Sequence, residues 1–149
     1  MPQSARPADR VAATFDDEAV SRAEAALKAL SINFQAWMTS EVDQLDAARL
    51  DARTANYSDA ALRALHVRAH DVKGLGSTYD YPFVTAIAQQ LCRLLETVMT
   101  AREGLHLIDA HVDAIRAVVR SGLRGEHDAT GRALVAELTT RVDRFAASE

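Results

Sequence analysis

Apolar residues recur at intervals of three and four along most of this chain. Such intervals place side chains on one face of an α-helix. No glycine or proline lies between Pro7 and Gly74, so nothing in the sequence interrupts long helices there. A single helix over residues 16–52 would be about 55 Å long, which favours a break or kink near residues 31–33. The repeat in this first segment comprises Val20, Leu27, Leu30, Phe34, Trp37, Met38, Val42 and Leu45.

Four further segments show the same repeat, at residues 58–79, 82–99, 105–119 and 134–145. Ser58 is suited to cap the first of them, and Pro82 is suited to the first turn of the second. No β-branched run alternates with polar residues, so no strand is predicted. The pattern predicts an all-α fold, an antiparallel up-and-down four-helix bundle with additional helical segments at the termini. We expect a flexible N-terminal segment at residues 1–15 and a single bundle domain at residues 16–149.

The segment after Ser58 carries two stripes. One is apolar and predicted to face inward: Leu62, Leu65, Ala69, Val72, Gly76 and Tyr79. The other is polar and mostly basic: Arg63, His66, His70, Lys73 and Ser77. His70 is therefore expected at the surface. A neutral imidazole has a free lone pair on one ring nitrogen and can act as a nucleophile.

Two glycines follow His70 closely within the same predicted helix. Each costs about 1 kcal/mol relative to alanine in a helix interior, and a local conflict of this kind is often the sign of a site. Gly74 lies one turn from His70, where bare backbone would admit another protein. Gly76 falls on the inward stripe, where close helix packing explains it better.

The pattern His70-x-x-Lys73-Gly74, followed by small residues and a second amphipathic helix, resembles the histidine-containing phosphotransfer (HPt) domain of multistep phosphorelays. The run through residues 78–82 resembles small stand-alone bacterial members of that family. The resemblance implies a four-helix bundle in which His70 accepts a phosphoryl group on Nε2 from a receiver-domain aspartyl phosphate and passes it to another receiver. It implies that Lys73 stabilises the phosphoryl charge and that Gly74 admits the receiver.

The chain departs from the family pattern at two positions. Many members have glycine ten residues after the histidine, where this chain has Asp80. Many have glutamine or glutamate about 22 residues after it, orienting the ring, where this chain has Cys92, a poor hydrogen-bond partner. Gln89, one turn earlier, is a substitute. The residues expected to neighbour the site or contact the partner are Arg63, His66, Val67, Ser77, Gln89 and Cys92.

The composition of the chain argues against several classes of function. The chain is 48% hydrophobic and 26% charged with a net charge of −4, which argues against a general nucleic-acid binder. Its single cysteine, Cys92, excludes an internal disulfide and a cysteine-cluster zinc site. His66 and His70 are four residues apart, but no third ligand accompanies them, so no metal site is expected. No apolar stretch is long enough for a membrane span, and no signal peptide is evident, so we expect a cytoplasmic protein.

No nucleotide-binding motif is present, so the predicted protein is a phosphotransfer carrier without ATP-dependent kinase activity. It needs no cofactor of its own, and Mg²⁺ is expected only in the partner receiver domain. The expected partners are receiver domains of hybrid histidine kinases and response regulators.

Two alternatives stay open. A degenerate HPt-like bundle would bind or sequester a receiver or kinase domain without phosphotransfer, and Asp80 and Cys92 favour it. A purely structural or dimerisation module would make the polar stripe accidental. The oligomeric state is undetermined, because exposed apolar positions on the first long helix would allow two copies to pair.

Overall fold

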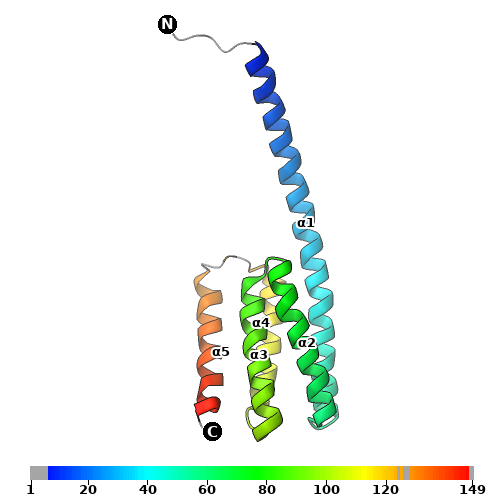
Figure 1. Cartoon of the computed structure of the whole chain (residues 1–149), viewed down its shortest axis with the longest axis vertical. Coiled ribbons are helices and arrows are strands. Elements are labelled where there is room, and N and C mark those ends of the chain that lie inside the picture. The colour runs from blue at the N-terminus through cyan, green and yellow to red at the C-terminus, as the bar shows by residue number, and fades with distance from the viewer. Residues whose placement is uncertain (1–6, 124, 126–127, 148–149) are drawn as a thin grey trace. The chain divides into compact units, whose positions relative to one another are not determined.

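The computed structural model describes residues 7–123, 125 and 128–147. Over these residues the chain forms five α-helices and no strand (Figure 1), which confirms the predicted all-α class. The helices are α1 (Pro7–Thr54), α2 (Asp59–Thr78), α3 (Pro82–Ala101), α4 (Leu105–Ser121) and α5 (Ala129–Ala147).

Helix α1 is longer than the sequence pattern suggested. It begins at Pro7, well before residue 16, and residues 31–33 are helical, so of the break or kink expected there the break is wrong. Serine and asparagine cost a helix interior less than about 0.7 kcal/mol each relative to alanine, and neither proline nor glycine stands nearby to interrupt the helix. Residues 1–6 of the expected flexible segment lie outside the described residues.

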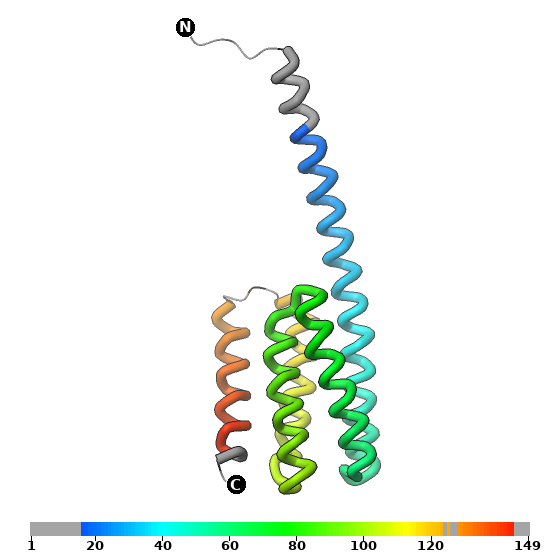
Figure 2. Tube along the Cα trace, in the orientation of Figure 1, coloured from blue at the N-terminus to red at the C-terminus, as the bar shows by residue number. Residues whose placement is uncertain are grey.

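The chain divides into two compact units, residues 1–33 and residues 34–149. In the second unit, α3 packs against α2, α4 and α5. The chain reverses direction in the short turn between α2 and α3 (Figure 2). Tyr81 in this turn and Phe83 in the first turn of α3 are buried. Ser58 caps α2 as predicted, accepting a hydrogen bond from the Ala61 backbone N–H, and Pro82 stands at the first position of α3. The predicted inward stripe of α2 is buried at Leu62, Leu65, Ala69, Val72 and Gly76.

Two aromatic residues at the start of the second unit form a cluster with Tyr79 at the end of α2. The rings of Phe34, Trp37 and Tyr79 are tilted against one another, with centroids 5.2–5.8 Å apart. The Trp37 side chain is nevertheless 47% exposed. The apolar spacing predicted core positions for Phe34 and Trp37, but Phe34 is only half-buried and Trp37 is exposed, so both lie outside the buried core.

A charged network joins the second half of α1 to α4. Arg49 is buried and forms ion pairs with Asp46 on its own helix and with Asp113 (2.7 Å) and Asp109 (3.3 Å) on α4. Arg53 adds a more exposed pair with Asp109, at 2.7 Å. Arg49 therefore occupies a buried position of α1, and the carboxylates of Asp109 and Asp113 on α4 offset its positive charge.

His111 of α4 is fully buried. Its Nδ1 lies 2.7 Å from the Leu107 carbonyl oxygen, whereas Nε2 has no partner among the described residues. Burial lowers the pKa of His111, the charge of Arg141 lowers it further, and the Leu107 contact opposes both effects. The folded protein therefore favours a neutral ring at this position.

This burial predicts a pH dependence of stability. Because the folded-state pKa of His111 lies below the ordinary value of 6.5, the unfolded chain takes up the proton first as the pH falls. We expect the contribution of His111 to be fully present above pH 6.5 and to decline below it, by at most about 1.4 kcal/mol per pH unit. Urea denaturation of the wild type and of His111→Gln between pH 7.5 and 5 measures it. The variant should lose part of the pH dependence, and parallel curves would contradict the prediction.

Within the part of the chain that the structure describes, no helix combines the length and apolar character needed to cross a bilayer.

Candidate functional site

His70 lies on the solvent-exposed face of α2, as the polar stripe predicts. Its ring makes no hydrogen bond or ion pair with another described residue, so both ring nitrogens are available to solvent or to a partner. Val67, one turn earlier, is 57% exposed, and Arg63 is exposed as well. An imidazole with open access on a rigid helix is therefore the centre of the candidate site.

Two contacts show the register between α2 and α3 around His70. His66 Nε2 lies 3.3 Å from Glu96 Oε1, and Ser77 Oγ lies 3.2 Å from Thr85 Oγ1. The two contacts are eleven residues apart on each helix. Residue numbers rise from His66 to Ser77 along α2 and fall from Glu96 to Thr85 along α3, so the two helices run in opposite directions. By this register Cys92 lies level with His70, and Gln89 lies level with Lys73.

Lys73 of α2 is half-buried, and Cys92 of α3 is buried. Burial raises the pKa of the Cys92 thiol, the charge of Lys73 lowers it, and Glu96 raises it. The net effect keeps the thiol protonated, so Cys92 is a packing residue of the core, as its apolar neighbours in the sequence predicted.

The two glycines differ in their surroundings. A Cβ at Gly74 would meet no atom within 4 Å, so the backbone beside His70 is open to an approaching molecule. A Cβ at Gly76 would collide with the Thr85 side chain and lie 2.9 Å from the Thr85 backbone nitrogen and 3.2 Å from the Tyr81 carbonyl oxygen. Gly76 thus permits close packing of α2 against the start of α3, as its place on the inward stripe predicted.

Two other members of the polar stripe, His66 and Ser77, contact side chains of α3. His66 is half-buried and paired with Glu96, and Ser77 is exposed but bonded to Thr85. Thr85 Oγ1 also donates a hydrogen bond to the Lys73 carbonyl oxygen, at 2.9 Å. Sequence reasoning missed Glu96 and Thr85, because the contacts that recruit them depend on the register of α3 against α2. Gln89 is exposed, one turn from the level of His70.

Asp80 occupies the turn after α2 with a backbone φ of +62°. This left-handed region suits glycine best, but aspartate and asparagine enter it more readily than most residues. The departure at Asp80 therefore leaves the turn intact, and Tyr81 N–H still bonds the Gly76 carbonyl oxygen at 2.7 Å.

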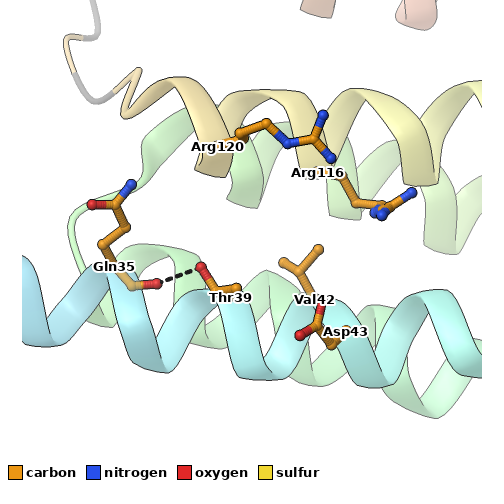
Figure 3. Close-up of a pocket in the computed structure, with 6 residues that line it drawn as sticks. All are labelled: Gln35, Thr39, Val42, Asp43, Arg116 and Arg120. Atoms are coloured by element: carbon orange, nitrogen blue, oxygen red, sulfur yellow. Dashed lines mark hydrogen bonds between the residues drawn. The ribbon is translucent and has the colours of Figure 1, made fainter.

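A pocket of about 250 Å³ lies elsewhere, between α1 and α4 (Figure 3). Thr39 Oγ1 donates to the Gln35 carbonyl oxygen at 2.8 Å, and Gln35 Nε2 donates to the Val119 carbonyl oxygen at 3.3 Å. Arg116 is within 3.8 Å of Asp46. Much of the polar lining of this pocket is thus engaged in contacts within the protein. The pocket shares no residue with the candidate site around His70. The lining residues are Gln35, Thr39, Val42, Asp43, Arg116 and Arg120.

No three His, Cys, Asp or Glu side chains of the described residues are grouped to hold a metal ion. Comparison of the chain with protein-family models, with curated proteins and with solved structures finds no match. The fold and the site therefore define an all-helical protein with an exposed histidine, a neighbouring lysine and open helical backbone on one face of α2.

Proposed function

We propose that this protein is a phosphorelay carrier that accepts a phosphoryl group on His70 from a receiver-domain aspartyl phosphate and passes it to a second receiver. The observation that carries the proposal is the combination on α2 of exposed His70, half-buried Lys73 and the open backbone at Gly74. The second half of α1 with α2, α3 and α4 would form the antiparallel four-helix core, and α5 would be an addition to it. The resemblance to HPt domains rests on the same residues.

The proposed transfer uses the neutral form of the His70 ring. The Nε2 lone pair attacks the phosphorus, the new P–N bond forms as the P–O bond to the aspartate breaks, and the aspartate leaves as a carboxylate. The Lys73 ammonium lies one turn away, where it offsets the negative charge of the phosphoryl oxygens. The partner receiver supplies Mg²⁺, and this chain supplies the acceptor nitrogen and the access that Gly74 provides.

A second candidate function has a specific observation in its favour. Cys92 lies level with His70 and is buried as a protonated thiol, so this position offers no strong acceptor to orient the ring. A bundle without an oriented ring would bind a receiver or kinase domain and sequester it without transfer. The two functions differ in whether His70 is needed for the biological effect.

Transfer from receiver domains of the same organism, charged with radiolabelled phosphate, tests the proposal. We expect acid-labile, base-stable label on the wild type and none on His70→Gln. Lys73→Gln should slow transfer roughly tenfold, since one charge-assisted contact is lost. His106→Gln is a matched control, because it removes an exposed histidine of α4 and should transfer normally.

The remaining outcomes also decide between the two functions. Label on His70→Gln equal to that on the wild type would contradict the assignment of His70. Binding of receivers by the wild type without transfer from any of them would favour the sequestering function.

A further inference from the structure

The pocket between α1 and α4 has one basic wall (Figure 3). Arg116 and Arg120 line it from α4, and Asp43 is the one carboxylate among the lining residues on α1. The whole chain has a net charge of −4, yet the side chains that line this pocket carry two positive charges and one negative charge. The pocket is therefore a place of local positive charge on an acidic protein.

The two arginines keep hydrogen-bond donors that the protein does not use. Arg120 is exposed and makes no hydrogen bond or ion pair with another described residue. Arg116 is half-buried, and its ion pair with Asp46 is long, at 3.8 Å. The carboxylate of Asp46 pairs more closely with Arg49. Both guanidinium groups of the pocket can therefore donate to a ligand.

The spacing of the two arginines also favours an anion. They are four residues apart, so they are neighbours on the surface of α4, and like charges at this spacing destabilise a helix. An anion bound between them would offset both charges. The same spacing lets both guanidinium groups reach a single ligand.

The last carbonyl groups of a helix carry partial negative charge, which disfavours an anion near the end of α4. In this protein those carbonyls already accept hydrogen bonds. The Val118 oxygen accepts from Leu123 N–H, at 3.1 Å. The Val119 oxygen accepts from Gly122 N–H at 3.2 Å and from Gln35 Nε2 at 3.3 Å. These bonds reduce the negative charge that faces the pocket, so the guanidinium groups decide its sign.

The donors of the pocket favour a phosphate group over a carboxylate. A guanidinium presents pairs of N–H groups that match two oxygens of either anion. The two oxygens of a carboxylate suit one arginine, whereas a phosphate has oxygens for both arginines and for the second N–H of the Gln35 amide. The pocket, of about 250 Å³, is smaller than pockets for drug-sized ligands, which start at about 300 Å³. Its ligand is therefore small.

We propose that this pocket binds a phosphate group between Arg116 and Arg120, either as inorganic phosphate or as part of a small phosphate ester. The carboxylate of Asp43 opposes the bound negative charge and limits the affinity. The pocket shares no residue with α2, and the proposal does not depend on phosphotransfer at His70.

Nuclear magnetic resonance titration of the ¹⁵N-labelled full chain with inorganic phosphate, at constant pH and ionic strength, tests the site. We expect saturable shifts of the side-chain signals of Arg116 and Arg120. Arg120→Gln should raise the dissociation constant about tenfold, since one charge-assisted contact is lost. Arg120→Lys keeps the charge and should raise it less. Asp43→Asn should lower it, because a like charge is removed.

Arg132→Gln is the matched control, because it removes an exposed arginine of α5 that lies outside the pocket. This variant and His70→Gln should bind phosphate as the wild type does. Circular dichroism would show that each variant is folded. A parallel titration with methyl phosphate distinguishes the two forms of the ligand: tighter binding than that of inorganic phosphate assigns the site to an ester, and weaker binding assigns it to the free ion.

Several results would overturn the proposal. They are the absence of a saturable shift, shifts centred on His70 and Lys73 instead of α4, and equal affinity of Arg120→Gln and Arg132→Gln for phosphate. Binding of acetate as tight as that of phosphate would overturn it too, because the pocket would then not select a phosphate group.

Discussion

Replacing Gly76 by alanine is expected to lower the free energy of unfolding by about 2–3 kcal/mol, whereas the same replacement at Gly74 should raise it by up to about 1 kcal/mol. The added methyl at Gly76 meets the backbone of Thr85 and Tyr81, which cannot turn aside as a flexible side chain would. At Gly74 the methyl meets nothing, so the higher helix propensity of alanine decides the sign. Urea denaturation of the two variants beside the wild type measures both effects.

The same pair of variants separates stability from partner access. If a receiver approaches His70 over the open backbone, Gly74→Ala should slow phosphoryl transfer although it stabilises the fold, and a bulkier Gly74→Leu should slow it further. Equal destabilisation by both alanine variants would contradict the packing described here. Unchanged transfer to Gly74→Leu would show that the partner does not use this backbone.

Replacing Arg49 by alanine is expected to destabilise the protein by about 3 kcal/mol. The change removes a buried guanidinium that pairs with Asp46, Asp109 and Asp113, and it leaves the buried side of the α1–α4 contact unfilled. Half-buried Asp46 then keeps its charge with only the distant guanidinium of Arg116, at 3.8 Å, to offset it. Thermal and urea denaturation would measure the loss.

Arg53→Ala is the matched control for this network. Arg53 is an arginine of the same helix that pairs with the same Asp109, but its side chain is 52% exposed. Solvent screens an exposed ion pair, so it contributes little to stability, and the variant should be close to the wild type. A similar loss in both variants would show that burial of Arg49 does not matter.

Local pattern in the sequence was sufficient for much of the fold. The stripe from Leu62 to Gly76 predicted the buried face of α2, and the separate polar stripe predicted an exposed His70. Ser58 and Pro82 marked the starts of α2 and α3 correctly. These features depend on residues within one or two helical turns, which is the range over which a sequence pattern can be interpreted directly.

The same reasoning failed for structural features that the local sequence pattern does not encode. The length of a single helix argued for a break or kink at residues 31–33, yet α1 continues without a break, because helix propensity at Ser31 and Asn33 is only slightly reduced. Arg49 and His111 gave no sign of burial, since a charged residue or a histidine within an apolar repeat is ordinarily at the surface.

By itself, then, the sequence determined the all-α class, which face of α2 is buried, and that His70 is exposed. The tertiary structure alone decided that Glu96 and Thr85 contact side chains of α2 and that Cys92 lies level with His70. It alone decided that two aspartates of α4 pair with Arg49. The physical reason is that helix formation and the position of a helical face follow from neighbours three and four residues apart. The register of one helix against another follows from the packing of whole faces, to which many distant residues contribute together.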